Sequence, residues 1–253
     1  MSATHPIQEF HEELYRSWGQ QHWWPGESAF EVVLGAFLTQ NTSWTNVEKA
    51  LANLRSERIA SIHGIRKTPL DKLERLIRPS GYFRQKARRL KRFVKFLDRR
   101  HSGSLKSLFA QPTEQLREEL LSLEGIGPET ADSILLYAGG HEVFVVDAYT
   151  RRIVERHGLL PGIPSYEAIR EAFEESLREP DANLPPPAPD FTDPRARGAA
   201  HNPSPASRLP RSPRAQVFGE MHALIVGVGK HFCRKSQPRC DGCPLQKFLP
   251  VAK

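Results

Sequence analysis

The segment at 121–152, LSLEGIGPETADSILLYAGGHEVFVVDAYTRR, limits the possible folds of this chain more than any other. Its apolar spacing predicts a helix that ends at Gly125-Ile126-Gly127, a tight turn whose glycines can adopt a positive φ and leave backbone N–H groups uncovered. Pro128 is a favoured first residue of a helix, so a second helix is expected directly after the turn. Two helices joined in this way form a hairpin whose exposed amides can bind a phosphate group.

Elsewhere, the apolar residues repeat with helical spacing, and strand-like alternation is scarce. The sequence therefore predicts an all-α protein. The apolar stripes that indicate buried helices are Phe30, Val33, Leu34, Phe37 and Leu38; Phe83, Ala87, Leu90, Val94 and Leu97; and Leu116, Leu120 and Leu123.

The net charge of +7 is compatible with a polyanionic partner but does not identify one. No run of about 18 apolar residues is present, so we expect no membrane-spanning segment. The first ten residues lack the basic and apolar regions of an export signal, and we therefore expect a cytoplasmic location.

Prolines recur near 179–215, and large apolar residues are few there. Such a stretch cannot bury enough surface to offset the entropy of ordering it, so we expect a disordered insertion at 179–215.

Four segments together resemble a known family. They are HWWP at 22–25, SAFEVVLGAFLTQNTSW at 28–44, RPSGYFRQKARRL at 78–90, and the hairpin GIGPETAD with the following VVDAYTRR. They are similar to the helix-hairpin-helix DNA glycosylases of the endonuclease III superfamily, and most of all to its bacterial 3-methyladenine DNA glycosylases. The resemblance implies a six-helix lobe over 29–146, a second helical lobe formed by 1–28 and 147–253, and a cleft between them.

In that family a catalytic aspartate begins the helix after the hairpin, and Asp147 occupies this position. A carboxylate there can stabilise the positive charge that develops on the sugar as the base departs, or activate the attacking water. Asp147 would also serve as an ordinary helix N-cap, and both roles can coexist.

Two positions indicate a branch of the family. Members that also cleave the strand carry a lysine nucleophile in the hairpin, where this chain has Glu129, and no lysine occurs between Phe109 and Val228. The adenine-mismatch branch has a glutamate where this chain has Ala36. The resemblance therefore implies a monofunctional glycosylase that uses water.

Trp24, Pro25 and Trp44 fall where the resembling enzymes have their base pocket, and we expect the base to lie between the two tryptophans. A 3-alkylated adenine is cationic, so aromatic rings can select it by stacking and cation–π attraction. Gln40 resembles the residue that enters the duplex in place of the flipped nucleotide, although it could simply be a hydrogen bonder at a helix end.

The three cysteines, Cys233, Cys240 and Cys243, match the first part of the family's [4Fe–4S] loop. The fourth position is Leu249. A cluster with a non-cysteine ligand, another metal assisted by His231, and a loop that has lost its metal all remain open. The neighbouring Arg234 and Lys235, like the hairpin residues Gly125, Ile126 and Gly127, are expected to contact DNA.

The expected function is base-excision repair: hydrolysis of the N-glycosidic bond of flipped alkylated purines such as 3-methyladenine, in damaged double-stranded DNA, by a monomer associated with a bacterial nucleoid. The alternatives are an endonuclease III-like glycosylase and AP lyase for damaged pyrimidines, and a DNA-binding module without catalysis.

Overall fold

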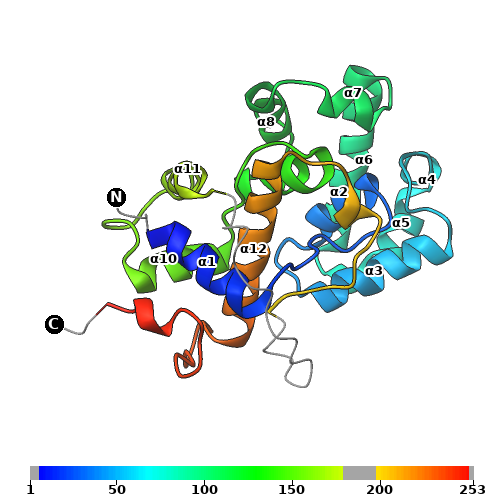
Figure 1. Cartoon of the computed structure of the whole chain (residues 1–253). Helices are drawn as coiled ribbons and strands as arrows, with labels where there is room; N and C mark the ends of the chain where they lie inside the picture. The colour runs from blue at the N-terminus through cyan, green and yellow to red at the C-terminus, as the bar shows by residue number, and fades with distance from the viewer. Residues whose placement is uncertain (1–5, 179–197, 251–253) are drawn as a thin grey trace. The chain divides into compact units, whose positions relative to one another are not determined.

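The computed structural model describes residues 6–178 and 198–250, and within these residues every regular element is helical (Figure 1). The all-α prediction is confirmed. No helix in the described residues is both long and apolar enough to cross a membrane. The elements are α1 (Pro6–Trp18), α2 (Ala29–Leu38), α3 (Trp44–Ser56), α4 (Ile62–Lys67), α5 (Leu70–Leu76), η1 (Arg78–Ser80), α6 (Phe83–His101), α7 (Leu105–Phe109), α8 (Thr113–Leu121), α9 (Pro128–Ser133), the π-helical η2 (Ile134–Gly139), α10 (Ala148–His157), α11 (Tyr166–Ser176), η4 (Ala206–Arg208), α12 (Pro213–His231) and η5 (Gln246–Phe248).

The chain forms two compact units. Unit 1 contains α1, α10, α11, α12 and the cysteine loop; unit 2 contains residues 24–140 together with 204–209. The resemblance implies a first lobe at 29–146; in the structure residues 141–146 fall in unit 1, where Phe144 stacks on Phe173 of α11, with ring centroids 4.4 Å apart.

Unit 2 is built around α2, which packs against α3, α6, α9 and η2. Nine of its ten residues are buried, as expected for a helix that is apolar on all sides. Two hydrogen bonds fix its start: the N-cap Ser28 side chain accepts from Glu31 N, and the Glu31 carboxylate accepts from Glu27 N at 2.9 Å, just before the N-cap. Arg55 of α3 donates two hydrogen bonds to the same carboxylate.

In unit 1, α12 packs against both α10 and α1. The contact with α10 is close, because a Cβ added at Gly229 would lie 2.1 Å from the ring of Tyr149. Glycine at position 229 therefore lets α10 and α12 pack closely, and this packing sets the position of the start of α10 relative to α12.

The prediction of disorder over 179–215 has two outcomes. Residues 179–197 lie outside the described part of the chain, whereas for residues 198–215 the prediction is wrong. There, small residues pack closely: Ala206 is fully buried, and a Cβ at Gly198 would meet the Trp18 ring at 2.6 Å. The composition of this segment predicts too little apolar surface to order it. Its small side chains, however, let the backbone pack directly against neighbouring residues.

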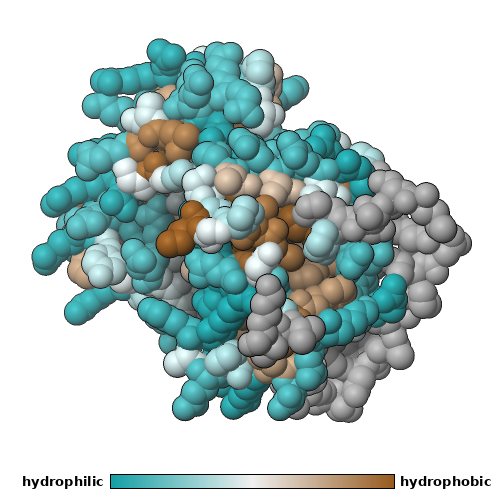
Figure 2. Space-filling model, turned by 90° about the vertical axis from the view of Figure 1, so that its left-hand side faces the viewer, coloured by the Kyte–Doolittle hydropathy of each residue, from teal (hydrophilic) through white to brown (hydrophobic). Residues whose placement is uncertain are grey.

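Hydrophilic residues predominate on the face shown in Figure 2, and apolar residues show only in limited areas. Among the described residues the exposed large apolar side chains are Leu70, Tyr82 and Ile163.

Candidate active site

Asp147 is the N-cap of α10, in an extended conformation with φ −99° and ψ −175°. Its Oδ1 accepts hydrogen bonds from Thr150 N at 2.8 Å and from Thr150 Oγ1 at 2.9 Å. The capping role foreseen for this residue is therefore present, and it occupies one of the two carboxylate oxygens.

The other oxygen, Oδ2, faces His222 of α12, whose Nε2 lies 3.7 Å away. The Asp147 side chain is 14% exposed and that of His222 6%. Burial alone would raise the pKa of Asp147, but the interactions with His222 and Thr150 outweigh it and hold this pKa below its usual value. The carboxyl group is thus ionised at neutral pH, with one oxygen left for chemistry.

Sequence reasoning missed His222. The signal was present, since His222 directly precedes the apolar run ALIVGV at 223–228, and both belong to the buried part of α12. What the sequence lacked was the partner, because Asp147 lies 75 positions earlier and only the packing of α10 on α12 brings the two together.

The hairpin forms as predicted between α8 and α9. Ile126 N donates to Leu123 O at 3.0 Å, and Gly125 has a φ of +86°, which favours glycine. A buried ion pair braces the two helices: Arg117 Nε and Nη2 donate to the Asp132 carboxylate at 2.7 and 3.1 Å. Gly127 is exposed, with open space where a Cβ would stand.

Gln40 lies against this hairpin within unit 2. Its Nε2 donates to Gly125 O at 3.0 Å and to Thr130 Oγ1 at 2.8 Å, and its Oε1 accepts from Arg89 at 2.8 Å. To enter a duplex the side chain would have to leave all three partners. The structure thus brings together two features that were predicted to contact DNA, Gln40 and the hairpin. It also places Arg89 beside Gln40.

Tyr82 is a second side chain that sequence reasoning missed. It is 66% exposed, has a φ of +45°, and stands as the N-cap of α6. It follows Gly81, which lies beside Thr42 of the loop that carries Gln40. An exposed aromatic residue in a left-handed conformation is unusual enough to suggest a function.

Trp24 and Trp44 contact each other directly and do not form the two sides of a slot. Their ring centroids are 5.2 Å apart with planes at 82°, and Trp24 also contacts Tyr137 at 5.3 Å. The expectation that a base lies between them is wrong for this arrangement, because the rings already touch. Trp24 is buried at 3% exposure, whereas Trp44 and Pro25 are half-buried. Trp44 is therefore the ring that can offer a face to a base, with Trp24 behind it.

Glu129, at the position of the family's lysine, is exposed in the first turn of α9. Ala36, at the position of the mismatch enzymes' glutamate, is buried at 1% exposure in α2. Neither position offers an amine nucleophile or a general acid in the form that the other branches use.

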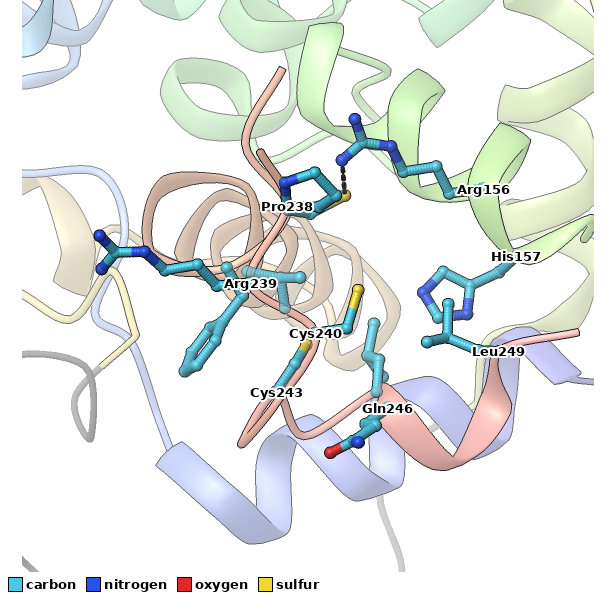
Figure 3. Close-up of a pocket in the computed structure, with 12 residues that line it drawn as sticks. Arg156, His157, Pro238, Arg239, Cys240, Cys243, Gln246 and Leu249 are labelled. Carbon is cyan, nitrogen blue, oxygen red and sulfur yellow. Dashed lines mark hydrogen bonds between the residues drawn. The ribbon is translucent and has the colours of Figure 1, made fainter. Parts of the chain in front are cut away.

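The three cysteines line one pocket together with residues from the end of α10 (Figure 3). Arg156 donates to Cys233 Sγ at 3.2 Å and to the carbonyl oxygens of Arg234 and Lys235 at 2.7 and 3.0 Å. Burial and the neighbouring thiols raise the pKa of Cys243 to about 11, which favours the protonated thiol.

These residues do not fit the four-thiolate set of a [4Fe–4S] cluster. Leu249, at the fourth position, presents an aliphatic side chain to the pocket beside His157 (Figure 3). His231 contacts Gly198 O at 2.9 Å and does not line the pocket, so it does not complete the set. Among the described residues, no group of three histidine, cysteine or acidic side chains is arranged to hold a metal ion. The side chains of Arg234 and Lys235 remain exposed.

Comparison with known proteins shows the family of this chain. The family model described as HhH-GPD superfamily base excision DNA repair protein matches residues 34–179. A protein of Methanocaldococcus jannaschii that carries the provisional name DNA repair glycosylase is 40% identical over 96% of this chain and 94% of its own length.

Two solved structures are also similar. The H. pylori 3-methyladenine DNA glycosylase bound to 1,N6-ethenoadenine has a TM-score of 0.67 and 30% identity, over 88% of this chain and 95% of that one. A trapped endonuclease III–DNA covalent intermediate has a TM-score of 0.72 over 98% of this chain and 96% of that one, and at 20% identity it supports the fold alone.

Proposed function

This chain belongs to the HhH-GPD superfamily of base excision DNA repair proteins, and from that premise we propose that it is a monofunctional DNA glycosylase for alkylated purines such as 3-methyladenine. The observation that carries the proposal is the Asp147 carboxylate: one oxygen caps α10, while the other is left for the reaction beside His222.

The reaction follows from what this carboxylate can do. When the bond between the sugar C1′ and the base nitrogen breaks, its electron pair leaves with the base, and a cationic alkylated adenine departs as a neutral molecule. The sugar then carries positive charge, which the ionised Asp147 stabilises. Water adds to C1′ and gives its proton to the Asp147 carboxylate. No amine is needed, in keeping with Glu129 at the lysine position.

The proposed substrate class rests on the aromatic residues and on one similar solved structure. The H. pylori enzyme that shares 30% identity is named for 3-methyladenine and holds a modified adenine. In this chain a half-buried Trp44, backed by Trp24, offers a stacking surface on which a cationic purine gains cation–π attraction. A weak glycosidic bond then needs no strong acid catalyst.

DNA would be held by two basic or amide-rich features. In the hairpin turn the Ile126 amide is already bonded to Leu123 O, so the exposed Gly127 offers its backbone amide, and Arg234 and Lys235 offer exposed charges. We propose that Gln40 leaves its partners on the hairpin to fill the space of the flipped nucleotide.

A set of otherwise identical duplexes tests the substrate class. Each carries one 3-methyladenine, one 1,N6-ethenoadenine, one oxidised pyrimidine or no lesion, and base release is measured in single-turnover reactions. We expect release of the alkylated purines and little release of the pyrimidine. Preferential release of the oxidised pyrimidine would overturn the substrate assignment.

Trp44→Ala tests the stacking surface. We expect it to slow excision of the alkylated purine by about tenfold or more, since stacking of one base on an aromatic ring contributes about 1–3 kcal/mol. Binding to undamaged duplex should change much less. Trp23→Ala is the matched control, because Trp23 belongs to unit 1 and its ring packs on His201. Equal losses of excision and of undamaged-duplex binding in Trp44→Ala would remove Trp44 from the pocket.

A further inference from the structure

His222 is a buried polar side chain in an otherwise apolar stretch of α12. It is 5% exposed, and its ring stands perpendicular to that of Phe144, with the centroids 6.5 Å apart. An apolar residue of similar size would fill this space without the cost of desolvating an imidazole. Such a residue calls for a reason beyond packing.

Docking of α12 on α10 does not supply that reason. The two helices already interlock where Tyr149 covers Gly229, and Arg152 donates to Cys233 O at 2.6 Å near the far end of the pair. His222 is therefore not needed to hold the helices together. What it does have is a position 3.7 Å from Asp147 Oδ2.

The two carboxylate oxygens are treated differently. Thr150 holds Oδ1 from within α10 with two hydrogen bonds, so this oxygen has little capacity left. Oδ2 is the oxygen that can face the sugar, and the residue beside it comes from a different helix. Anchors from two helices fix the rotation of the carboxylate, which a single cap from its own helix would leave freer.

We propose that His222 is a positioning residue of the glycosylase reaction, which orients the Asp147 carboxylate so that Oδ2 is presented to the reacting sugar. This inference rests on the proposed function, because it assigns His222 a role through Asp147. His222 forms no bond to substrate in this scheme, and no bond is made or broken at its ring.

The role predicts an effect on the acid limb of the reaction. Among the described residues, the groups that act on the Asp147 carboxylate are His222 of α12 and Thr150 of α10, and both lower its pKa against the effect of burial. Removing the imidazole therefore raises the pKa of Asp147. The ionised form is then lost at a higher pH, and the acid limb of the rate profile moves toward neutral pH.

The test compares His222→Phe and His222→Gln with the wild type in single-turnover base release from a 3-methyladenine duplex between pH 4.5 and 8. Displacement of a reacting group by about 1 Å can cost about 10²-fold in rate, so His222→Phe, which leaves the Asp147 carboxylate free to turn, should slow release by about tenfold or more. Affinity for the damaged duplex should stay within about twofold. His222→Gln can still donate an N–H and should recover part of the rate. His157→Gln, a half-buried histidine at the other end of α10, is the matched control and should keep the wild-type profile.

The outcomes separate the two proposals. If Asp147→Asn is inactive while His222→Phe keeps the wild-type rate constant and acid limb, His222 has no positioning role. If Asp147→Asn keeps its activity, the proposed function itself fails. Should His222→Phe not fold, as judged by its thermal melt, His222→Gln carries the test: an acid limb shifted to higher pH supports the role, and an unchanged profile and rate overturn it.

Discussion

The helix pair α10 and α12 carries very different chemistry at its two ends. At one end Asp147, the N-cap of α10, meets His222 of α12. At the other end Arg156, in the last turn of α10, meets Cys233, just beyond α12. Both ends lie in unit 1. At each end an ionisable side chain of α10 or its N-cap contacts a polar side chain in α12 or just beyond it.

The two ends differ in whether a polar atom is left for a reaction. At the first end an ionised carboxylate keeps one oxygen for a reaction. At the second end Arg156 binds one thiol and two backbone carbonyls of the loop, and Leu249 stands where a fourth metal ligand would be. Under the proposed function, the same helix pair serves catalysis at one end and holds the cysteine loop in shape at the other, and three substitutions can break or sharpen this comparison.

Asp147→Asn should have the largest effect. Asparagine is as good an N-cap as aspartate, so α10 should keep its start and the melting temperature should change little. The loss of the negative charge should slow base release by about 10²–10³-fold or more. Single-turnover base release and a thermal melt on the same preparation measure both effects. If neither the variant nor the wild type releases any damaged base, the chain is a DNA-binding module without catalysis.

Glu220→Gln tests a second buried carboxyl group of the pair, which lies in α12. Burial raises the pKa of Glu220 to about 7, whereas the pKa of Asp147 is held below its usual value. A carboxyl group whose pKa is higher in the folded state contributes its stability below the unfolded value of 4.5 and loses it as the pH rises through 7. The wild type should therefore lose up to about 3 kcal/mol between pH 4.5 and 8 from this group. The variant should lack that slope and be the more stable form at pH 8. Urea unfolding at several pH values measures it, and parallel slopes in the two proteins would contradict the assignment.

Arg156→Ala tests the opposite end and should have a smaller effect. The loop loses its contacts with the Arg156 guanidinium, and we expect a loss of about 1–3 kcal/mol in the free energy of unfolding. The rate constant of base release should stay within about twofold, because Asp147 and His222 are untouched. Arg239→Ala is the matched control, since this exposed arginine also lines the pocket but extends its guanidinium away from Cys240 and Cys243 (Figure 3). A large drop in the rate constant for Arg156→Ala alone would mean that the two ends are not separate.

Features carried by neighbouring residues could be predicted from the sequence. The stripes around Phe37 and Leu90 gave α2 and α6, and GIGPETAD gave the hairpin, because helical periodicity and turn chemistry act over a few residues. Asp147 at the start of α10 followed from the same local pattern together with the resemblance.

Contacts between distant segments could not be predicted. His222 beside Asp147, Arg89 beside Gln40, and the packing of Gly198 on Trp18 each depend on how helices dock. Periodicity says which face of a helix is buried, but not which residue of another helix it meets. Trp24 and Trp44 were expected to stand on either side of a base but form an edge-to-face pair, since ring orientation is set by packing around both side chains.

The central claim is that the Asp147 end of the pair hydrolyses a glycosidic bond with water and leaves the strand intact. The most direct measurement uses a duplex with one 3-methyladenine, scores base release and strand cleavage separately, and adds borohydride to a parallel reaction. The account predicts free base, an abasic strand that breaks only on later treatment with alkali, and no protein trapped on DNA. Strand cleavage in step with base release, together with a borohydride-trapped covalent complex, would contradict it and show an amine nucleophile at work.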